Sequence, residues 1–379
     1  MQVWPFAPRE EMTETLEWLT EVIRTQLSEQ RIALRAAPRR SYGFSHVLDA
    51  QSYAAAQEML RGSAGFLVPD WTQVVRLMAV DAGADVEIAF DTACLDLRAG
   101  AQAILWSAPG AWEVIDVVAV APSGITATVS RSWGKVRLMP LRPARAPDGL
   151  SAQRLTRHYA SASIRLDITE NTSHAATSYP QYRGHDVMTD CPRIGGGGLD
   201  EGVVWPVEVV DNELGRVVAL RERAVPDASF TMRWRVFGVC AIAGLRAWLH
   251  SRRGRQKAFW LSSRGRDFVP LVDVSAAATT VTVQALPGLA ALARQSFDVE
   301  LVTMTGAVIR RRVISWSVDF AGRVVLQLDA AVGVTVQVSQ VRRLSWLRCV
   351  RFNADRIELT HRAAGGVEVA IPCLEVPVP

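Results

Sequence analysis

The chain has few cysteines, and none of them lies close to another. It has five in 379 residues, and no two form a CxxC pair. Cysteines that are odd in number and widely spaced encode neither a local disulfide framework nor a thiolate metal cluster. We therefore expect reduced, mostly buried thiols at Cys94, Cys191, Cys240, Cys349 and Cys373.

Long hydrophobic runs are also missing. The most apolar window, residues 236–249, is interrupted by Arg246 and is too short to span a bilayer. The first five residues lack a basic region followed by an apolar one, as a secretion signal would have. We expect neither membrane insertion nor a secretion signal.

Lysine is nearly absent, so the positive charge comes almost entirely from arginine. Lys135 and Lys257 are the two lysines, the formal net charge is +4, and the pI is near 9.0. Acidic residues are interspersed throughout, and no basic run is longer than Arg310, Arg311 and Arg312. A nucleic-acid-binding surface would need a denser basic patch, so we expect no nucleic-acid binding.

Motifs that carry chemistry are lacking too. The sequence contains no GxSxG, no HExxH, and no GxGxxG before a helical pattern. Asp70 and Asp267 each follow an apolar run and are the candidate carboxylates, but a turn cap explains that position first. We expect no enzymatic activity and no cofactor.

Two stretches far apart in the chain carry the same order of signals. Residues 230–271 contain an aromatic strand pattern, a helical pattern, a Gly-Arg turn and an apolar run. Residues 42–71 repeat that order in weaker form. Further matched segments are 17–22 with 205–210, 31–35 with 216–221, and the two hairpin patterns that begin at Val114 and Val313.

Each repeat covers about 180 residues, which is far longer than a solenoid period. The short strands between glycine breaks are typical of a sandwich or barrel. We predict a mainly β protein with two tandem, internally duplicated β-sandwich or barrel-like domains, each with one short packed helix. The expected boundaries are 1–175, a Gly-rich linker or arm at 176–203, and 204–379. The alternative is two unrelated β-rich domains.

The two helices are expected at 52–61 and 242–252, and a terminal hairpin is expected to turn at Gly365 and Gly366. Each helix has an apolar stripe that predicts a buried face. The stripes are Ala54, Ala55, Met59 and Leu60 in the first helix, and Ile242, Leu245, Trp248 and Leu249 in the second.

The segment 171–202 differs in composition from both halves. It contains the run Gly195, Gly196, Gly197 and Gly198, which cannot form a stable helix or strand interior. We expect an exposed connector that orders against a neighbouring subunit, so these glycines are candidate interface residues. The segment also has metal-capable side chains, at His185, Asp186, Asp190 and Cys191, but nothing in their spacing fixes a tetrahedral site.

The densest cationic cluster follows the second helix. Arg252, Arg253 and Arg255 flank Gly254 in a predicted turn. Cations there complement the negative end of the helix dipole. In an assembly the same turn would meet an acidic neighbour, so these three arginines are the other candidate interface residues.

Several short segments, in this order, resemble minor tail proteins of long-tailed bacteriophages, in the distal-tail and tail-tip group. The segments are 6–8, 17–20, 28–35, 38–40, 182–184, 210–212, 215–216, 254–255, 259–261 and 355–359. One departure is that residues 262–264 lack the proline and tryptophan found at Pro69 and Trp71 in the first copy. The two copies are therefore expected to face different neighbours.

The resemblance implies a virion protein without catalytic residues. Such a protein assembles in the cytoplasm of the host bacterium as a homo-oligomeric ring, a trimer or hexamer, that joins the tail tube to the tip, hub or baseplate. Three copies of a two-domain chain would present six similar domains.

The alternative function is a carbohydrate-binding module for the host surface. Trp106, Trp112 and Trp133 could form a stacking platform for sugars. A glycan binder would gather exposed aromatics on one face, whereas a ring subunit would spread its interface residues over two opposite sides.

Overall fold

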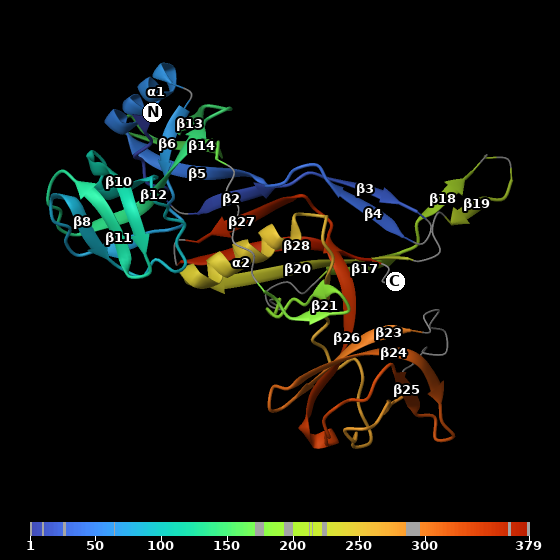
Figure 1. The fold of residues 1–379 in the computed structure, drawn as a ribbon. Coiled ribbons are helices and arrows are strands. Elements are labelled where there is room, and N and C mark those ends of the chain that lie inside the picture. Colours follow the sequence, from blue (N-terminus) through green and yellow to red (C-terminus); the bar gives the residue numbers. More distant parts are fainter. Residues whose placement is uncertain are drawn as a thin grey trace.

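The computed structural model describes residues 2–9, 11–25, 28–63, 65–170, 178–192, 200–211, 213, 215–221, 226–285, 296–362 and 365–376. The protein is mainly β, as predicted, and the part described has two α-helices. Figure 1 shows a shared sheet in the middle, a lobe with β8, β10 and β11 at one end of it, and a second lobe with β23, β24 and β25 to one side.

The first half runs from β1 to β14. Its elements are β1 (Gln2–Val3), β2 (Met12–Glu17), β3 (Thr20–Arg24), β4 (Glu29–Ala33), β5 (Arg39–Asp49), α1 (Ala50–Gly62), β6 (Gly65–Pro69), β7 (Val75–Leu77), β8 (Gly83–Ala89), β9 (Gln102–Ala108), β10 (Ala111–Ala121), β11 (Gly124–Val129), β12 (Val136–Arg145), β13 (Leu150–Arg154) and β14 (Tyr159–Ile168).

A short two-stranded ribbon, β15 (Gln181–Tyr182) and β16 (His185–Asp186), precedes the second half. The remaining elements are β17 (Asp200–Val204), β18 (Val207–Val210), β19 (Val218–Arg221), β20 (Asp227–Phe237), α2 (Val239–Arg252), β21 (Phe259–Ser262), β22 (Thr280–Val283), β23 (Phe297–Thr303), β24 (Val308–Val318), β25 (Val324–Leu328), a 3-10 turn (Val338–Gln340), β26 (Val341–Phe352), β27 (Arg356–His361) and β28 (Gly366–Glu375).

The two halves follow the same order of elements and the same pairings. In each half, the strand that precedes a small hairpin pairs with the long strand that precedes the helix. In the first half β2 pairs with β5, and the hairpin between them in the chain is β3–β4. In the second half β17 pairs with β20, and the hairpin between them is β18–β19. The last strands pair alike, β13 with β14 and β27 with β28. The lobes also match, because β8–β11–β10–β9–β12 corresponds to β22–β25–β24–β23–β26. Two copies of one fold would give this arrangement. The common origin and the sandwich description stay predictions.

The predicted hairpins are present. The patterns that begin at Val114 and Val313 fall in the antiparallel pairs β10–β11 and β24–β25, and β27–β28 forms the terminal hairpin. A turn with φ of +83° at Gly365 precedes β28, and this backbone conformation suits glycine.

The helix faces were predicted well for α2 and only in part for α1. Ile242, Leu245, Trp248 and Leu249 are all buried in α2. In α1 Ala56 is the buried residue, with Tyr53, Met59 and Leu60 packed partly against the same core. Ala54 and Ala55 are exposed, so that part of the predicted stripe is wrong. The larger Tyr53 and Met59 reach the sheet and set which face turns inward.

The halves meet edge to edge in one continuous antiparallel sheet. Its eight strands run in the order β13, β14, β5, β2, β27, β28, β20 and β17. The first four belong to the first half and the last four to the second. The strand pair β2–β27 is therefore the junction between the halves, and Figure 1 shows these two strands side by side in the middle of the molecule.

Candidate assembly interface

The junction strand β2 has one polar face and one that points into the core. Met12, Glu14 and Leu16 alternate with Thr13 and Thr15, as expected for a strand. Leu16 lies opposite Ile357 of β27, and their exposures are 1% and 2%. An apolar pair is therefore buried across the boundary between the halves.

Glu14 is the centre of a buried group of charges at this junction. Its side chain is fully buried. It accepts hydrogen bonds from Arg40 Nε at 2.8 Å, from Arg246 Nη2 at 2.6 Å, and it lies 2.8 Å from His361 Nε2. Arg40 is on β5 of its own half, whereas Arg246 and His361 come from α2 and β27 of the second half. One carboxylate thus joins side chains from both halves.

Asp70 extends this cluster at the end of β6. Its carboxylate accepts from Gln73 Nε2 at 2.9 Å and from Arg40 Nη2 at 3.3 Å. It also accepts from the backbone N–H of Thr72 at 3.1 Å, which is the predicted turn cap. Asp70 is therefore both a cap and a member of the buried cluster. Asp267, the other candidate carboxylate, accepts from the backbone N–H of Trp346 at 2.8 Å and from the Ser263 hydroxyl, so it ties its loop to β26 instead of capping a turn.

The charge states follow from these partners. Burial alone would raise the pKa of the Glu14 carboxyl, but Arg246 and Arg40 lower it more, so its pKa lies well below the usual range. Asp70 behaves in the same way, because Arg40 and Arg246 outweigh the effect of burial on its pKa. Both carboxylates are ionised in the folded chain. A buried carboxylate held by cations suits a structural role, since its charge is already neutralised.

Few of these contacts could be predicted from the sequence. Glu14 and Arg40 stand at inward positions of alternating strands, and Arg246 interrupts the apolar stripe of α2. A charged residue at an inward position is the available signal, because such residues are rarely buried without a partner. The sequence does not reveal that Glu14 contacts Arg246, 232 positions away, or His361, 347 positions away.

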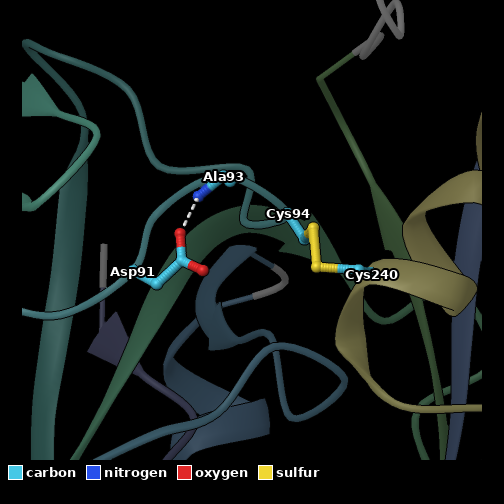
Figure 2. Close-up of a disulfide and its surroundings, with 4 residues drawn as sticks. All are labelled: Asp91, Ala93, Cys94 and Cys240. Atoms are coloured by element: carbon cyan, nitrogen blue, oxygen red, sulfur yellow. Dashed lines mark hydrogen bonds between the residues drawn. A yellow bond between two sulfur atoms is a disulfide. The ribbon is translucent and has the colours of Figure 1, made fainter.

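A disulfide adds a covalent link between the halves and corrects the prediction of reduced thiols. Cys94, in the loop after β8, is bonded to Cys240 in the first turn of α2, 146 residues away (Figure 2). Figure 2 also shows the Ala93 N–H donating to Asp91 at 2.9 Å, a contact that orders this loop. Sequence spacing could not reveal the pair because only the meeting of the two halves brings the cysteines together. Cys191, Cys349 and Cys373 are free thiols, the last two buried.

The residue of the second half that corresponds to Glu14 is Glu201, and its surroundings are different. Glu201 faces Phe230, the fourth residue of β20, as Glu14 faces Tyr42, the fourth residue of β5. The Glu201 side chain is 51% exposed, and its cation is Arg348 at 3.7 Å. Glu14 is buried because another half covers it, and within the described chain nothing covers Glu201 in that way.

The basic turn after α2 packs against its own chain. Arg252 is 2% exposed, lies over the Trp248 ring at 4.5 Å, and donates to the carbonyl of Ala258 and the carboxylate of Asp186. Burial lowers its pKa to about 10. Its expected role as an exposed interface cation is therefore wrong.

The rest of the turn touches the junction. The backbone N–H of Arg255 donates to Asp355 at 3.0 Å, and a Cβ on Gly254 would lie 2.3 Å from the same carboxylate. Of the three predicted arginines, Arg253 is exposed and Arg255 is half-buried. The glycine run 195–198 lies outside the described residues.

The described part of the connector, residues 178–192, also packs on its own chain. Tyr182 donates to Asp298 at 2.8 Å, and its carbonyl accepts from Trp260 Nε1 at 2.7 Å. Val187 and Met188 are buried, at 1% and 3% exposure. The expectation of a poorly packed connector is wrong for this part, because its aromatic and apolar side chains fill the core beside β21.

The tryptophans proposed as a sugar platform do not share one surface. Trp106 is buried against Trp71 at 5.2 Å, and Trp112 packs on that same core. Trp133 packs on the separate core of the first-half lobe. The three rings are mainly packing residues.

The described ranges contain no group of three His, Cys, Asp or Glu side chains placed to hold a metal, and His185, Asp186, Asp190 and Cys191 are not gathered into one. Nor does any helix described here have the length and apolar character needed to cross a membrane. No protein-family model matches the chain, and no curated protein matches its sequence.

Proposed function

We propose that the chain is a structural subunit of a bacteriophage tail, a ring-forming component at the distal end that joins the tail tube to the tip or baseplate. The observation that carries this proposal is the shared sheet. Two equivalent four-stranded units are joined edge to edge, and β13 and β17 stand at the two ends of the series. A unit that joins its own copy through one edge is suited to continue into a closed ring.

The face of the shared sheet that points away from the core is suited to line a water-filled channel. One row of residues across the strands contains Thr13, Thr360, Glu368 and Arg235, on the face opposite the core. Arg235 and Glu368 form an ion pair at 3.3 Å. Small polar residues and paired charges in this row are compatible with a water-filled channel.

The disulfide is compatible with a protein that works outside the cell. Disulfides persist in secreted proteins and on virion surfaces and are rare in the cytosol. The Cys94–Cys240 bond would form after the particle leaves the reducing cytoplasm, and it would fix the two halves in the assembled tail.

Electron microscopy tests the proposal. The purified chain should form rings in negative stain, and antibodies against it should label the distal end of tails in particles from the same source. A chain that stays monomeric at all accessible concentrations and is absent from tails would contradict the proposal.

A further inference from the structure

The shared sheet ends in two strands that each have one pairing partner within the described chain. β13 pairs with β14, and β17 pairs with β20. An edge strand presents a row of unpaired backbone N–H and C=O groups, and it readily accepts another strand. The β17 edge also carries Val203 and Val204, which are 68% and 63% exposed.

These two edges are the equivalents of the two strands that form the junction. β17 corresponds to β2, because Glu201 and Glu14 each face the fourth residue of an 11-residue strand. β13 corresponds to β27, because Arg154 and His361 each face the second residue of a 10-residue strand, β14 and β28. Each edge of the chain thus has the form of one side of its own internal junction.

We propose that β17 of one copy pairs antiparallel with β13 of a second copy, and that this contact repeats the β2–β27 junction between chains. This inference rests on the proposed ring function and specifies the surface that closes the ring. Transferring the register of the internal junction places Val203 opposite Leu150 of the second copy, as Leu16 lies opposite Ile357. The exposed valine would then be buried.

The charges on the two edges agree with this register. In the internal junction, Glu14 of β2 reaches His361 of β27 at 2.8 Å. The same positions on the free edges hold Glu201 and Arg154, which have opposite charges. Arg154 lies over the ring of Tyr53 on α1, 5.7 Å from its centre, on the side of β13 that faces the helix. The pair would form beside α1, as Glu14 and His361 meet beside α2.

The flanking residues repeat as well. Trp18, four residues after Glu14, donates its backbone N–H to the carbonyl of Asp355 at 2.9 Å and packs on His250 of α2. Trp205 lies four residues after Glu201, and Asp148 lies six residues before Arg154, as Asp355 lies six before His361. Trp205 is 37% exposed and Asp148 is exposed. A matching tryptophan and aspartate therefore accompany the matching charges.

This contact is head to tail, so it generates a ring where the rotation closes. Three copies of the eight-stranded sheet would contribute 24 strands, in six equivalent units. At about 4.8 Å between strands, the ring of strands would be about 115 Å around and about 37 Å across, and wider where strands tilt. The channel would be lined by the polar face of the sheet.

Cysteine cross-linking tests the register. In full-length chain carrying Cys191→Ala, the pair Val203→Cys and Leu150→Cys should form intermolecular disulfides under mild oxidation, because directly opposed residues lie within disulfide range. Each single substitution should give no ladder of covalent oligomers. The pair Val203→Cys and Ser151→Cys is the register control, since those side chains would point to opposite faces.

Charge reversal tests the ion pair. Glu201→Arg should weaken self-association about tenfold or more, and adding Arg154→Glu should restore it. Circular dichroism should confirm that each variant is folded, which is expected because both residues lie on exposed edges. Rings that form without the Val203–Leu150 cross-link and ignore both reversals would overturn this inference and leave the ring function standing. A chain that forms no assembly at all would overturn both.

Discussion

At the residue scale, Glu14 is the buried carboxylate that links side chains from both halves. It is the acceptor for Arg40 and Arg246, both buried, and it contacts His361. Replacing it leaves two guanidinium groups buried without their main counter-charge. Loss of one partner from a buried ion pair is strongly destabilising, whereas loss of an exposed pair costs little.

We predict that Glu14→Gln lowers the free energy of unfolding by about 3–5 kcal/mol. The matched control is Glu201→Gln at the equivalent, exposed position, which should change the stability of the isolated chain by about 0–1 kcal/mol. Urea titration followed by tryptophan fluorescence measures both. Equal effects of the two substitutions would show that burial at the junction is not the cause.

The same residues predict a loss of stability in acid. Glu14 and Asp70 have pKa values below their ordinary values in the folded chain, so the folded state binds protons less readily than the unfolded state. Their contribution is complete above the unfolded pKa values of about 4 and is lost as pH falls through the lower folded values.

Thermal unfolding between pH 7 and pH 2.5 measures this dependence. The melting temperature should fall below pH 4, and the fall should be shallower in Glu14→Gln, which lacks one of the two groups. An identical acid profile in that variant would contradict the assignment.

At the scale of elements, helix α2 is fixed to the first half at two points. Cys240 in its first turn is bonded to Cys94, and Arg246 further along reaches Glu14. The covalent link closes a loop of 146 residues, and long loops lose much entropy when closed in the unfolded chain.

We predict that Cys94→Ala with Cys240→Ala lowers the free energy of unfolding by about 2–5 kcal/mol. The free and exposed Cys191 gives the control, because Cys191→Ala should have no effect. Calorimetry with and without reductant adds a check. Reductant should lower the melting temperature of the unaltered chain and leave the double variant unchanged.

Much of the fold could be predicted because its signals are local. The alternation of apolar residues in β27 and β28 and the turn at Gly365 predicted the hairpin, and the stripe on α2 predicted its buried face. The repeated order of segments indicated two similar halves. Each of these depends on residues close together in sequence.

The junction could not be predicted because it depends on the meeting of distant segments. Cys94 and Cys240 gave no spacing signal, and Arg252 was expected to be exposed although Trp248 and Asp186 bury it. The disulfide was missed because each half was treated alone, whereas the burial of Arg252 was missed because its turn was treated apart from the connector that packs on it. The charged residues at inward strand positions were the sequence signal that another part of the chain packs over them.

At the scale of the whole molecule, the chain is an open series of two units. Its internal junction buries Leu16 and Ile357 and neutralises Glu14, while the equivalent Val203 and Glu201 at the far edge stay exposed. An open series leaves one such edge at each end, whereas a closed ring leaves none. The ring should therefore be more stable than the separate chains.

Assembly of this kind makes stability depend on protein concentration. A partner that binds only the folded chain stabilises it by mass action, so we predict that the melting temperature rises as concentration increases over two or three decades. Val203→Lys should abolish the rise, because Val203 is 68% exposed in the single chain but would be buried at the contact. Its melting temperature at low concentration should equal that of the unaltered chain.

The control is Val318→Lys, at a lobe position that is 54% exposed and far from both edges in sequence. This variant should keep the dependence of the melting temperature on concentration. Differential scanning fluorimetry across the concentration series decides the matter, and a melting temperature that is independent of concentration in the unaltered chain would exclude the ring.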